Sequence, residues 1–358
     1  MPAVTLPGDR SEAERTPALT LPGAAAAPLR RVAPGAHPRE ASAPGTRVPG
    51  AEALAGAVGR PGAAGPVPAL TPVQAADAIE RVLLEGLDPE AAPARSAVPV
   101  PAGELLLMPA ASAEYAGVKI AGVAPANPAV GLPRITGSYL LLDGPTLQPV
   151  ALLDGAALTA LRTPAVTAVA LRRLAAPDAE HLVLFGAGPQ AYGHLDALVA
   201  VRPLSRVTVV ARSAAPAEAL AAYARGRGLS TRVGTPDAVA GADLVVCCTT
   251  ARTPLFDGEL VPGHAVVVAV GSHEPDACEV DAALVGRAEL YVEARAAALR
   301  EAGDLLMAGV TGADVLWNLA ELVRGEVPVP SDRPRFFKSV GMAWEDLAVA
   351  AQMHRCGG

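Results

Sequence analysis

One junction constrains the fold of this 358-residue chain most: the mostly apolar run HLVLF (residues 181–185) passes directly into the turn GAGPQA. The turn fits G-x-G-x-x-A, in which Gly186 permits a tight turn and Gly188 omits the Cβ that would block a phosphate. Ala191 lets a helix pack close to the sheet, and the helix N-terminus offers free N–H groups to a pyrophosphate. Because the motif joins a predicted strand to a predicted helix, we predict a dinucleotide site rather than a plain turn. Its predicted residues are Gly186, Gly188, Pro189, Gln190 and Ala191.

The region around this turn alternates between strand and helix. Strands are predicted at 181–185, 206–211, 231–233, 244–249, 264–270 and 289–293, with helices after the first two and a short helix at 235–242. Strands that alternate with helices form parallel βαβ units. The sequence therefore predicts an α/β fold in which residues 177–309 form a Rossmann-type, doubly wound parallel sheet domain.

A second domain is predicted from the residues on either side. A helix within 71–89 has an N-capping Thr71, a proline at its first position and a stop at Gly86. Strands at 104–110, 117–123, 138–143 and 149–154 predict a mostly antiparallel sheet, and a helix at 163–175 with apolar faces is expected to be buried between domains. The tail is predicted to be helical and to pack back on this sheet. The second domain is thus predicted as a discontinuous α+β substrate-binding domain, residues 66–176 with 310–358.

Composition narrows the possible partners and location. Residues 1–65 are rich in Pro, Ala and Gly, and we predict that this tail is disordered because it buries too little apolar surface. The net charge of −7 disfavours nucleic acid and anionic membranes as partners. The four cysteines show no metal-ligand or disulfide spacing, so no metal site is predicted. With no signal peptide or membrane-spanning run recognised, we predict a cytoplasmic protein.

Two basic features carry further information. The second predicted strand of the parallel sheet ends before Arg212 and Ser213, where an NAD-preferring site usually has an acidic residue. Arginine can pair with a 2′-phosphate, so NADP(H) is predicted over NAD(H), although Arg212 can also be a solvated cation. Only two of the 29 basic residues are lysines, Lys119 and Lys338. Each lysine is present either by chance or because its position needs a compact ammonium group.

Several stretches together resemble the ornithine cyclodeaminase/mu-crystallin family. They are RSAVPVPAGELLLMPA, YAGVKIAGVAPANPAVGLP, LTALRTPAVTAVALRRLA, GAGPQA, ADLVVCCTT, VGSHEPDACEVD and FFKSVGMAWEDLA, which span about residues 95–346. The resemblance implies a dimeric enzyme with a substrate domain beside a Rossmann domain. It also implies that Arg95, Lys119 and Arg162 bind the substrate carboxylate, with Arg162 close to the nicotinamide, and that Thr249 and Ser339 belong to the cofactor site. Lys338 either lies by the nicotinamide or only fixes the closing helix.

The chain departs from that family in one loop. Ornithine cyclodeaminases carry an aspartate for the substrate's δ-amino group, followed by a lysine, where this chain has His273 and Ala277. An imidazole does not attract an ammonium as a carboxylate does, so ornithine deamination is disfavoured. His273 can instead donate a proton near neutral pH, and Lys119 is the other predicted proton donor. The alternative is that His273 only hydrogen-bonds its loop.

These observations favour an NAD(P)H-dependent oxidoreductase that reduces small imino acids, such as Δ1-pyrroline-2-carboxylate, by hydride transfer. Two alternatives stay open at this stage. One is an ornithine cyclodeaminase, a lyase that converts ornithine to proline and ammonia. The other is a protein that binds NADPH and a small ligand with little turnover. In each case the predicted partners are a small amino or imino acid and a second copy of the chain.

Overall fold

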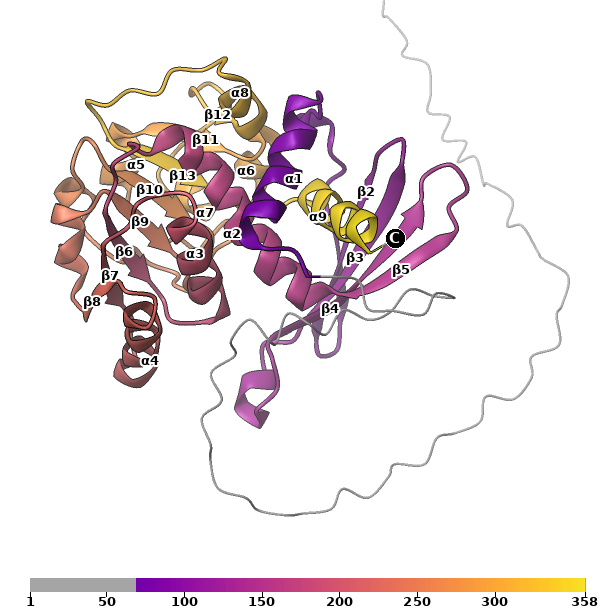
Figure 1. The fold of residues 1–358 in the computed structure, drawn as a ribbon, viewed down its shortest axis with the longest axis horizontal. Helices are drawn as coiled ribbons and strands as arrows, with labels where there is room; N and C mark the ends of the chain where they lie inside the picture. The colour runs from indigo at the N-terminus through magenta and orange to yellow at the C-terminus, as the bar shows by residue number, and fades with distance from the viewer. Residues whose placement is uncertain (1–68, 358) are drawn as a thin grey trace, which may run out of the picture. The chain divides into compact units, whose positions relative to one another are not determined.

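The computed structural model describes residues 69–357, so the predicted disorder of residues 1–65 lies outside the described residues. The described chain forms two sheets (Figure 1). The α/β fold predicted from the sequence, with one parallel and one antiparallel sheet, is confirmed. No helix among residues 69–357 is long and apolar enough to cross a membrane.

The first sheet is an antiparallel meander with strand order β1-β2-β3-β4-β5. Its strands are β1 (Ser96–Val100), β2 (Gly103–Ala111), β3 (Tyr115–Val123), β4 (Ile135–Asp143) and β5 (Pro149–Asp154). Four of them were predicted, while β1 was not recognised as a strand. Alternate residues of β3 face inward, and these include Lys119, Ala121 and Val123. The fold thus places Lys119 on the covered face of the sheet.

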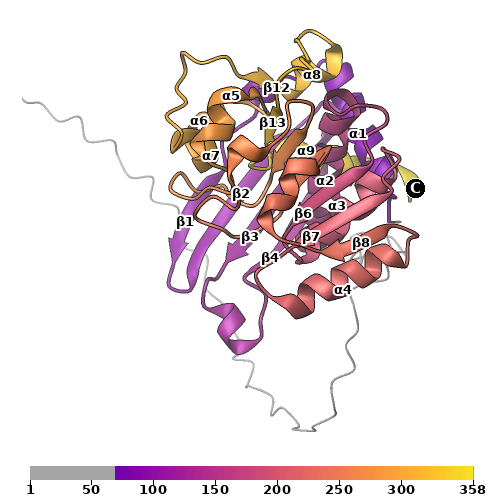
Figure 2. The same cartoon turned by 90° about the vertical axis from the view of Figure 1, so that its left-hand side faces the viewer.

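The second sheet has eight parallel strands in the order β12-β11-β13-β10-β9-β6-β7-β8. They are β6 (His181–Phe185), β7 (Arg206–Val210), β8 (Ser230–Val233), β9 (Leu244–Cys247), β10 (Val266–Ala269), β11 (Glu289–Val292), β12 (Trp317–Asn318) and β13 (Arg335–Lys338). Figure 2 shows β6, β7 and β8 side by side, with the crossover helices α3 (Pro189–Val199) and α4 (Ala214–Arg225) along them. The sheet orders β6, β7 and β9 so that the loops after their carboxyl ends lie at one edge.

The prediction that the tail is helical throughout is wrong at two places. Residues 335–338 form β13, which lies between β10 and β11 in the parallel sheet, and residues 317–318 form β12 at its edge. All four residues of β13 are buried, so its short run RFFK lacks the alternation that identifies a half-exposed strand. The division into domains stays a prediction, but these two strands pair with the sheet assigned to residues 177–309.

The long helix α2 (Gly155–Leu174) also differs from its prediction. Its predicted start at Thr163 is wrong because the helix begins eight residues earlier, at Gly155, where the Asp154 side chain caps it by accepting the N–H groups of Ala156 and Ala157. Pro164 therefore lies inside the helix, where a proline removes one backbone hydrogen bond. A Cβ on Gly193 of α3 would lie 2.9 Å from the Pro164 ring and 3.1 Å from the Ala160 carbonyl oxygen. Close packing by α3 therefore covers the irregular turn.

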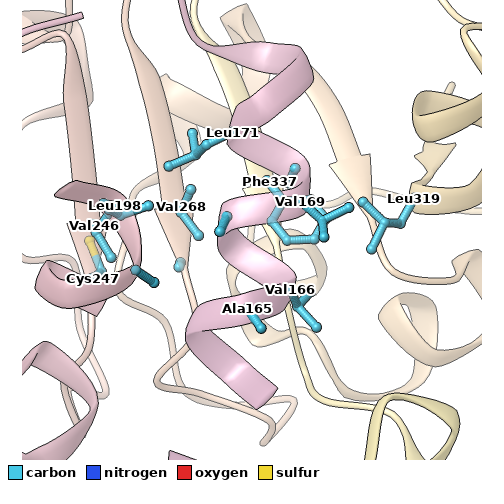
Figure 3. Close-up of a cluster of buried hydrophobic side chains, with 14 of the residues drawn as sticks. Ala165, Val166, Val169, Leu171, Leu198, Val246, Cys247, Val268, Leu319 and Phe337 are labelled. Carbon is cyan, nitrogen blue, oxygen red and sulfur yellow. The ribbon is translucent and has the colours of Figure 1, made fainter. Parts of the chain in front are cut away.

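The predicted burial of α2 is confirmed. Figure 3 shows its apolar side chains Ala165, Val166, Val169 and Leu171 among residues of the parallel sheet and of helix α8 (Leu319–Arg324). Helix α2 also packs against α1 (Pro72–Leu84) and α9 (Ala343–Cys356). Helix α2 thus contacts strands of both the antiparallel and the parallel sheet.

The remaining elements close the fold. Helix α1 begins with the predicted Thr71 cap, which forms a capping box with Gln74. Helix α9 lies between α1 and strands β2 and β3, so the chain end does return to the first sheet (Figure 1). The short helices are η2 (Pro89–Ala91), η3 (Asn127–Val130), η4 (Pro236–Gly241), η5 (Gly258–Leu260), α5 (Ala282–Arg287), α6 (Arg295–Glu301) and α7 (Gly303–Leu306).

Candidate active site

The GAGPQA turn has the geometry that a dinucleotide site needs. Gly186 has a φ of +101°, and a Cβ there would lie 2.5 Å from the Cys248 carbonyl oxygen, so only glycine fits. A Cβ on Gly188 would meet no described atom within 4 Å, which leaves open space before α3. No side chain caps the N-terminus of α3, and Ala191 is fully buried against the core. These residues fit a pyrophosphate bound at the helix N-terminus.

Arg212 and Ser213 follow β7 beside this turn. Both are exposed, and neither side chain makes a hydrogen bond or ion pair with any residue in 69–357. Ser213 is the N-cap residue of α4, but its hydroxyl does not cap the helix. Both groups are therefore available to a ligand at the end of β7.

A second group of polar residues lies at the ends of β9 and β10. The Thr249 N–H and hydroxyl both donate to Glu279 Oε1 at 2.7 Å, and the Gly271 N–H donates to Oε2 at 2.7 Å. Burial raises the pKa of Glu279 although Lys338 and these hydrogen bonds favour its ionised form. Glu279 thus ties two strand-end loops together.

Lys338 is connected to Glu279 through Asp304. Its Nζ lies 2.8 Å from Asp304 Oδ2, and both side chains are fully buried. Asp304 Oδ1 accepts the backbone N–H groups of Glu279 and Val280 at 2.6 and 3.0 Å. Because no surface of Lys338 is exposed, the structure places this lysine in the sheet interior and not at a ligand.

Lys119 and Arg162 share one buried carboxylate. Asp346 Oδ2 forms an ion pair with Lys119 Nζ at 2.7 Å, and Oδ1 accepts a hydrogen bond from Arg162 Nε at 3.3 Å. Burial lowers the pKa of Lys119, and Arg162 adds to that effect while Asp346 opposes it. For Arg162, burial is outweighed by Asp346, Glu345 and Glu293, so its pKa is raised. These contacts fix both side chains against the covered face of the antiparallel sheet.

Tyr139 of β4 lies beside this pair, opposite Lys119 in the strand register. Its hydroxyl is buried and has no hydrogen-bond partner among the described residues. Burial and the charge of Asp346 raise the Tyr139 pKa well above 10. The phenol therefore stays protonated next to the ion pair.

Arg95 approaches the same region from the segment between η2 and β1. Its Nη2 donates to the carbonyl oxygens of Val340 and Gly341 at 2.8 and 2.7 Å, and its Nε pairs with Glu301 at 2.9 Å. A Cβ on Gly341, whose φ is +79°, would lie 2.7 Å from both terminal nitrogens of Arg162. Gly341 thus lies between the Arg95 and Arg162 guanidinium groups and contacts both.

His273 lines a cleft of about 460 Å³ that both sheets border. The cleft's other lining residues include Glu104 and Val123 of the antiparallel sheet and Thr250 and Arg252 after β9. Burial and the nearby charge of Arg95 lower the pKa of His273 below 6.5. The ring is therefore mainly neutral at pH 7 and faces the side of the site where Arg95 lies.

The structure joins the predicted cofactor turn to the predicted substrate residues. Gln190, in the first turn of α3, donates to the Thr159 carbonyl oxygen at 3.4 Å, and the Thr159 hydroxyl accepts from Lys119 Nζ at 3.3 Å. Ser339 donates to Glu293, which also accepts the N–H of Gly341, the residue that lies against the Arg162 guanidinium. Arg95, Lys119, Arg162 and Ser339 are thus brought together, while Arg212 and Ser213 lie apart at the end of β7.

Sequence reasoning missed every acidic member of this site. Asp346 and Glu345 stand in the quoted motif FFKSVGMAWEDLA, and both fall in the first turn of α9. Acidic residues are common in first helical turns because they favour the helix dipole, so their pattern indicates a helix start rather than a site. Glu293 and Glu301 carried no signal, since each contacts the site only through tertiary packing.

The family model for ornithine cyclodeaminase/mu-crystallin proteins matches residues 74–355. This chain belongs to the ornithine cyclodeaminase/mu-crystallin family. It is 36% identical over 264 residues to ketimine reductase mu-crystallin of Mus musculus, covering 72% of this chain and 82% of the relative. It is 38% identical over 260 residues to the Δ1-pyrroline-2-carboxylate/Δ1-piperideine-2-carboxylate reductase of Azospirillum brasilense, with the same coverage.

The fold also resembles that of a solved structure. The structure of Thermococcus litoralis Δ1-pyrroline-2-carboxylate reductase in complex with NADH and L-proline matches with a TM-score of 0.75 and 29% sequence identity. The match covers 80% of this chain and 93% of that one.

Proposed function

We propose that this protein is an NAD(P)H-dependent reductase of small cyclic imino acids such as Δ1-pyrroline-2-carboxylate. The observation that carries the proposal is the pair of hydrogen bonds that Thr159 accepts, one from Gln190 in the dinucleotide turn and one from the buried Lys119. A reductase needs a cofactor and an anionic substrate side by side, and these hydrogen bonds link the two sites through helices α2 and α3. The names of the Mus musculus, Azospirillum brasilense and Thermococcus litoralis relatives support the same reaction.

Three cations are proposed to hold the substrate carboxylate. Each keeps a donor free of the contacts described above: Nη1 of Arg95, Nη2 of Arg162 and one proton of Lys119. Arginine and lysine donors bind carboxylates strongly in a site that excludes water. Binding a carboxylate through two nitrogens of Arg95 would require its contacts with residues 340 and 341 to rearrange, because Nη2 is already engaged.

The proposed cofactor site consists of the GAGPQA turn with Arg212, Ser213, Thr249, Ser339 and Arg162. When bound, the reduced nicotinamide supplies the hydride that the imine carbon accepts. The free cation of Arg212 favours NADP(H), because it can pair with a 2′-phosphate that NAD(H) lacks. Replacing Arg212 with Asp should therefore weaken NADPH binding more than tenfold and NADH binding far less. Equal losses for both cofactors, measured by nicotinamide fluorescence titration, would show that Arg212 does not contact the phosphate.

The proton for the nitrogen is proposed to come from Lys119. Its lowered pKa makes the ammonium a better acid than an exposed lysine. His273, neutral at pH 7, is the second proposed catalytic residue and orients the substrate or a water in the cleft. Where ornithine cyclodeaminases have an aspartate, this neutral ring offers no charge to a δ-ammonium, which supports reduction over deamination.

A homodimer is also proposed. The outer face of the antiparallel sheet carries the exposed apolar side chains Val98, Leu105, Ile120 and Leu152. Neighbouring exposed apolar groups of this kind mark protein interaction surfaces. The predicted cytoplasmic location stays a prediction.

The test is a nicotinamide absorbance assay on the purified protein. NADPH and NADH consumption would be followed with Δ1-pyrroline-2-carboxylate and Δ1-piperideine-2-carboxylate, beside an ammonia assay with ornithine and NAD. We expect imine-dependent oxidation of NADPH and no ammonia. Ammonia and proline from ornithine without net cofactor change would instead establish the lyase. NADPH binding without turnover of either kind would establish a binding protein.

A further inference from the structure

The hydroxyl of Thr159 lies between the start of helix α2 and the Lys119 ammonium. It donates to the Gly155 carbonyl oxygen at 2.7 Å, and its oxygen lies 3.3 Å from Lys119 Nζ. A hydroxyl has a single proton, and the hydrogen bond to Gly155 uses it. Only lone pairs of the oxygen are then left for Lys119, so Nζ is the donor and Thr159 the acceptor.

The start of α2 keeps this acceptor in place. Asp154 caps the helix by accepting two backbone N–H groups, at 2.8 and 3.0 Å. A Cβ on Gly155 would lie 2.9 Å from the carbonyl carbon of Gly137, so the helix start packs directly on β4. Strand β4 pairs with β3, the strand that carries Lys119. The Thr159 hydroxyl and Lys119 are therefore held on closely packed elements.

The two contacts of the ammonium differ in kind. Its ion pair with Asp346 Oδ2 spans 2.7 Å, but that oxygen accepts no hydrogen bond from any residue in 69–357. The contact with Thr159 has hydrogen-bond geometry. A charge attraction sets how close two groups come, whereas a hydrogen bond also sets the direction of the N–H bond. Thr159 therefore determines how the three N–H bonds of the ammonium are directed.

The proton that remains is the one that a ligand can use. Lys119 is only 4% exposed, so its ammonium is largely shielded from bulk water. A buried donor without an acceptor is costly, and the carboxylate or the imine nitrogen of an imino acid supplies an acceptor. The direction of this N–H bond matters, because proton transfer needs the donor and the acceptor within hydrogen-bond reach and correctly aligned.

We propose that Thr159 is a positioning residue that orients the Lys119 ammonium, so that its remaining proton faces the imino acid. The use of that proton rests on the proposed function, which assigns Lys119 to the substrate. The orientation does not, because it follows from the contacts of Thr159 with Gly155 and Lys119. The link to the cofactor turn is separate, since Gln190 donates to the Thr159 carbonyl oxygen and not to its side chain.

The contact is tested by NMR spectroscopy of the full-length protein, isotope-labelled at lysine Cε. The chain has only two lysines, Lys119 and Lys338, so two signals are expected, and Lys119→Met assigns them. Thr159→Val removes the accepting oxygen and keeps a β-branched side chain. The midpoint of the Lys119 titration should then move to lower pH, because the ammonium loses an acceptor that favours its charged form. An unchanged midpoint would overturn the proposal.

The other charged and titratable groups around Lys119 Nζ are the same in both proteins. They are Arg162 from α2, Glu345 and Asp346 from α9, and Tyr139 from β4. Thr159→Ser keeps the hydroxyl, so the Lys119 midpoint should match the wild type. Thr231→Val is the matched control, because Thr231 on β8 also donates to a backbone carbonyl oxygen, that of Leu229 at 3.1 Å. This control should change neither lysine signal.

Steady-state kinetics test what the orientation does. Thr159→Val should lower kcat/KM for Δ1-pyrroline-2-carboxylate about tenfold, the effect of losing one hydrogen bond to a charged group. Thr159→Ser should stay within about threefold of the wild type. The Kd for NADPH should change less than about threefold in both variants, since the main-chain contact with Gln190 remains. The alkaline limb of the pH profile should move to lower pH in Thr159→Val alone.

The outcomes separate the possible failures. A lowered Lys119 midpoint with unchanged kcat/KM would show that Thr159 contacts the ammonium without positioning it, which overturns the proposal. Equal losses in Thr159→Ser and Thr159→Val would also overturn it, because packing and not the hydroxyl would then matter. A wild type that reduces no imine would overturn the proposed function, while the NMR comparison would still decide whether Thr159 holds Lys119. If Thr159→Val does not fold, Thr159→Ala gives the same comparisons.

Discussion

The two lysines of the chain occupy matching positions in its two sheets but differ in their surroundings. Lys119 on β3 and Lys338 on β13 each form an ion pair with a buried aspartate, at 2.7 and 2.8 Å. The aspartate of Lys119 is shared with a second cation, Arg162. The aspartate of Lys338 is instead held by two backbone N–H groups. The first pair is therefore part of a larger charged cluster, and the second is fixed by the backbone of the parallel sheet.

This difference teaches which buried ion pair can take part in binding. Lys119 keeps a free donor beside the second cation, Arg162, so this cluster can contact an additional anion. The isolated ion pair between Lys338 and Asp304 already has balanced charges, and neither side chain has any exposed surface. Both lysines are buried and basic, so these two properties do not distinguish them. The residues that surround each lysine in the structure do.

The largest expected effect is on catalysis and comes from Lys119→Met. Removing the ammonium should lower kcat/KM for the imine by about 1,000-fold, the size expected when a desolvated charge partner is lost. NADPH should still bind, because the dinucleotide turn keeps its geometry. Steady-state kinetics and a fluorescence titration measure the two quantities. Turnover within a few-fold of wild type would remove Lys119 from the site and make the two lysines equivalent.

Lys338→Met should instead act on stability. Breaking a fully buried pair leaves Asp304 without its partner, which typically destabilises a protein by about 3–5 kcal/mol. The midpoint of urea unfolding should fall accordingly, and a second change, Asp304→Asn, should restore part of the loss, because the amide oxygen still accepts the N–H groups of Glu279 and Val280 and no charge is left unpaired. If the single variant keeps wild-type stability but loses its activity, Lys338 has a direct role in the reaction.

Glu279→Ala sharpens the comparison, because Glu279 connects the Lys338 pair to the loops at the cofactor edge. The variant frees Thr249 and Gly271, so the KM for NADPH should rise about tenfold while the KM for the imine changes less. Initial rates at varied concentrations of each substrate separate the two constants. A larger effect on the imine would mean that these loops position the substrate rather than the cofactor.

Much of the fold could be predicted because its signals are local. The GAGPQA turn, the alternating strands and the Thr71 cap each depend on a few neighbouring residues, and all were located correctly. The failures were also local: β13 is too short and too buried to show alternation, and Pro164 resembled a helix start although a close helix covers it. The predicted arginines and Lys119 came from the family resemblance and do lie together.

The acidic half of the site could not be predicted, for a physical reason. Asp346, Glu293 and Glu301 lie on different elements, and only packing of α9 against α2 and β3 brings the first of them to Lys119. Each alone resembles a helix-start or surface acid. Their function depends on which cation they face, and no spacing along the chain encodes that contact.

The smallest expected effect concerns pH and separates activity from stability at Lys119. Because burial lowers its pKa, the ammonium should lose its proton below the ordinary value of 10.5, and kcat/KM for the imine should fall through that pKa. In the same interval the unfolded chain binds more protons than the folded one at this residue, so its contribution to stability rises with pH. Lys119→Arg should lower kcat/KM and remove the alkaline limb, since arginine stays protonated and cannot deliver its proton to the imine nitrogen. Parallel urea unfolding distinguishes the two explanations: activity that falls together with stability would mean that general unfolding, and not Lys119, sets the limb.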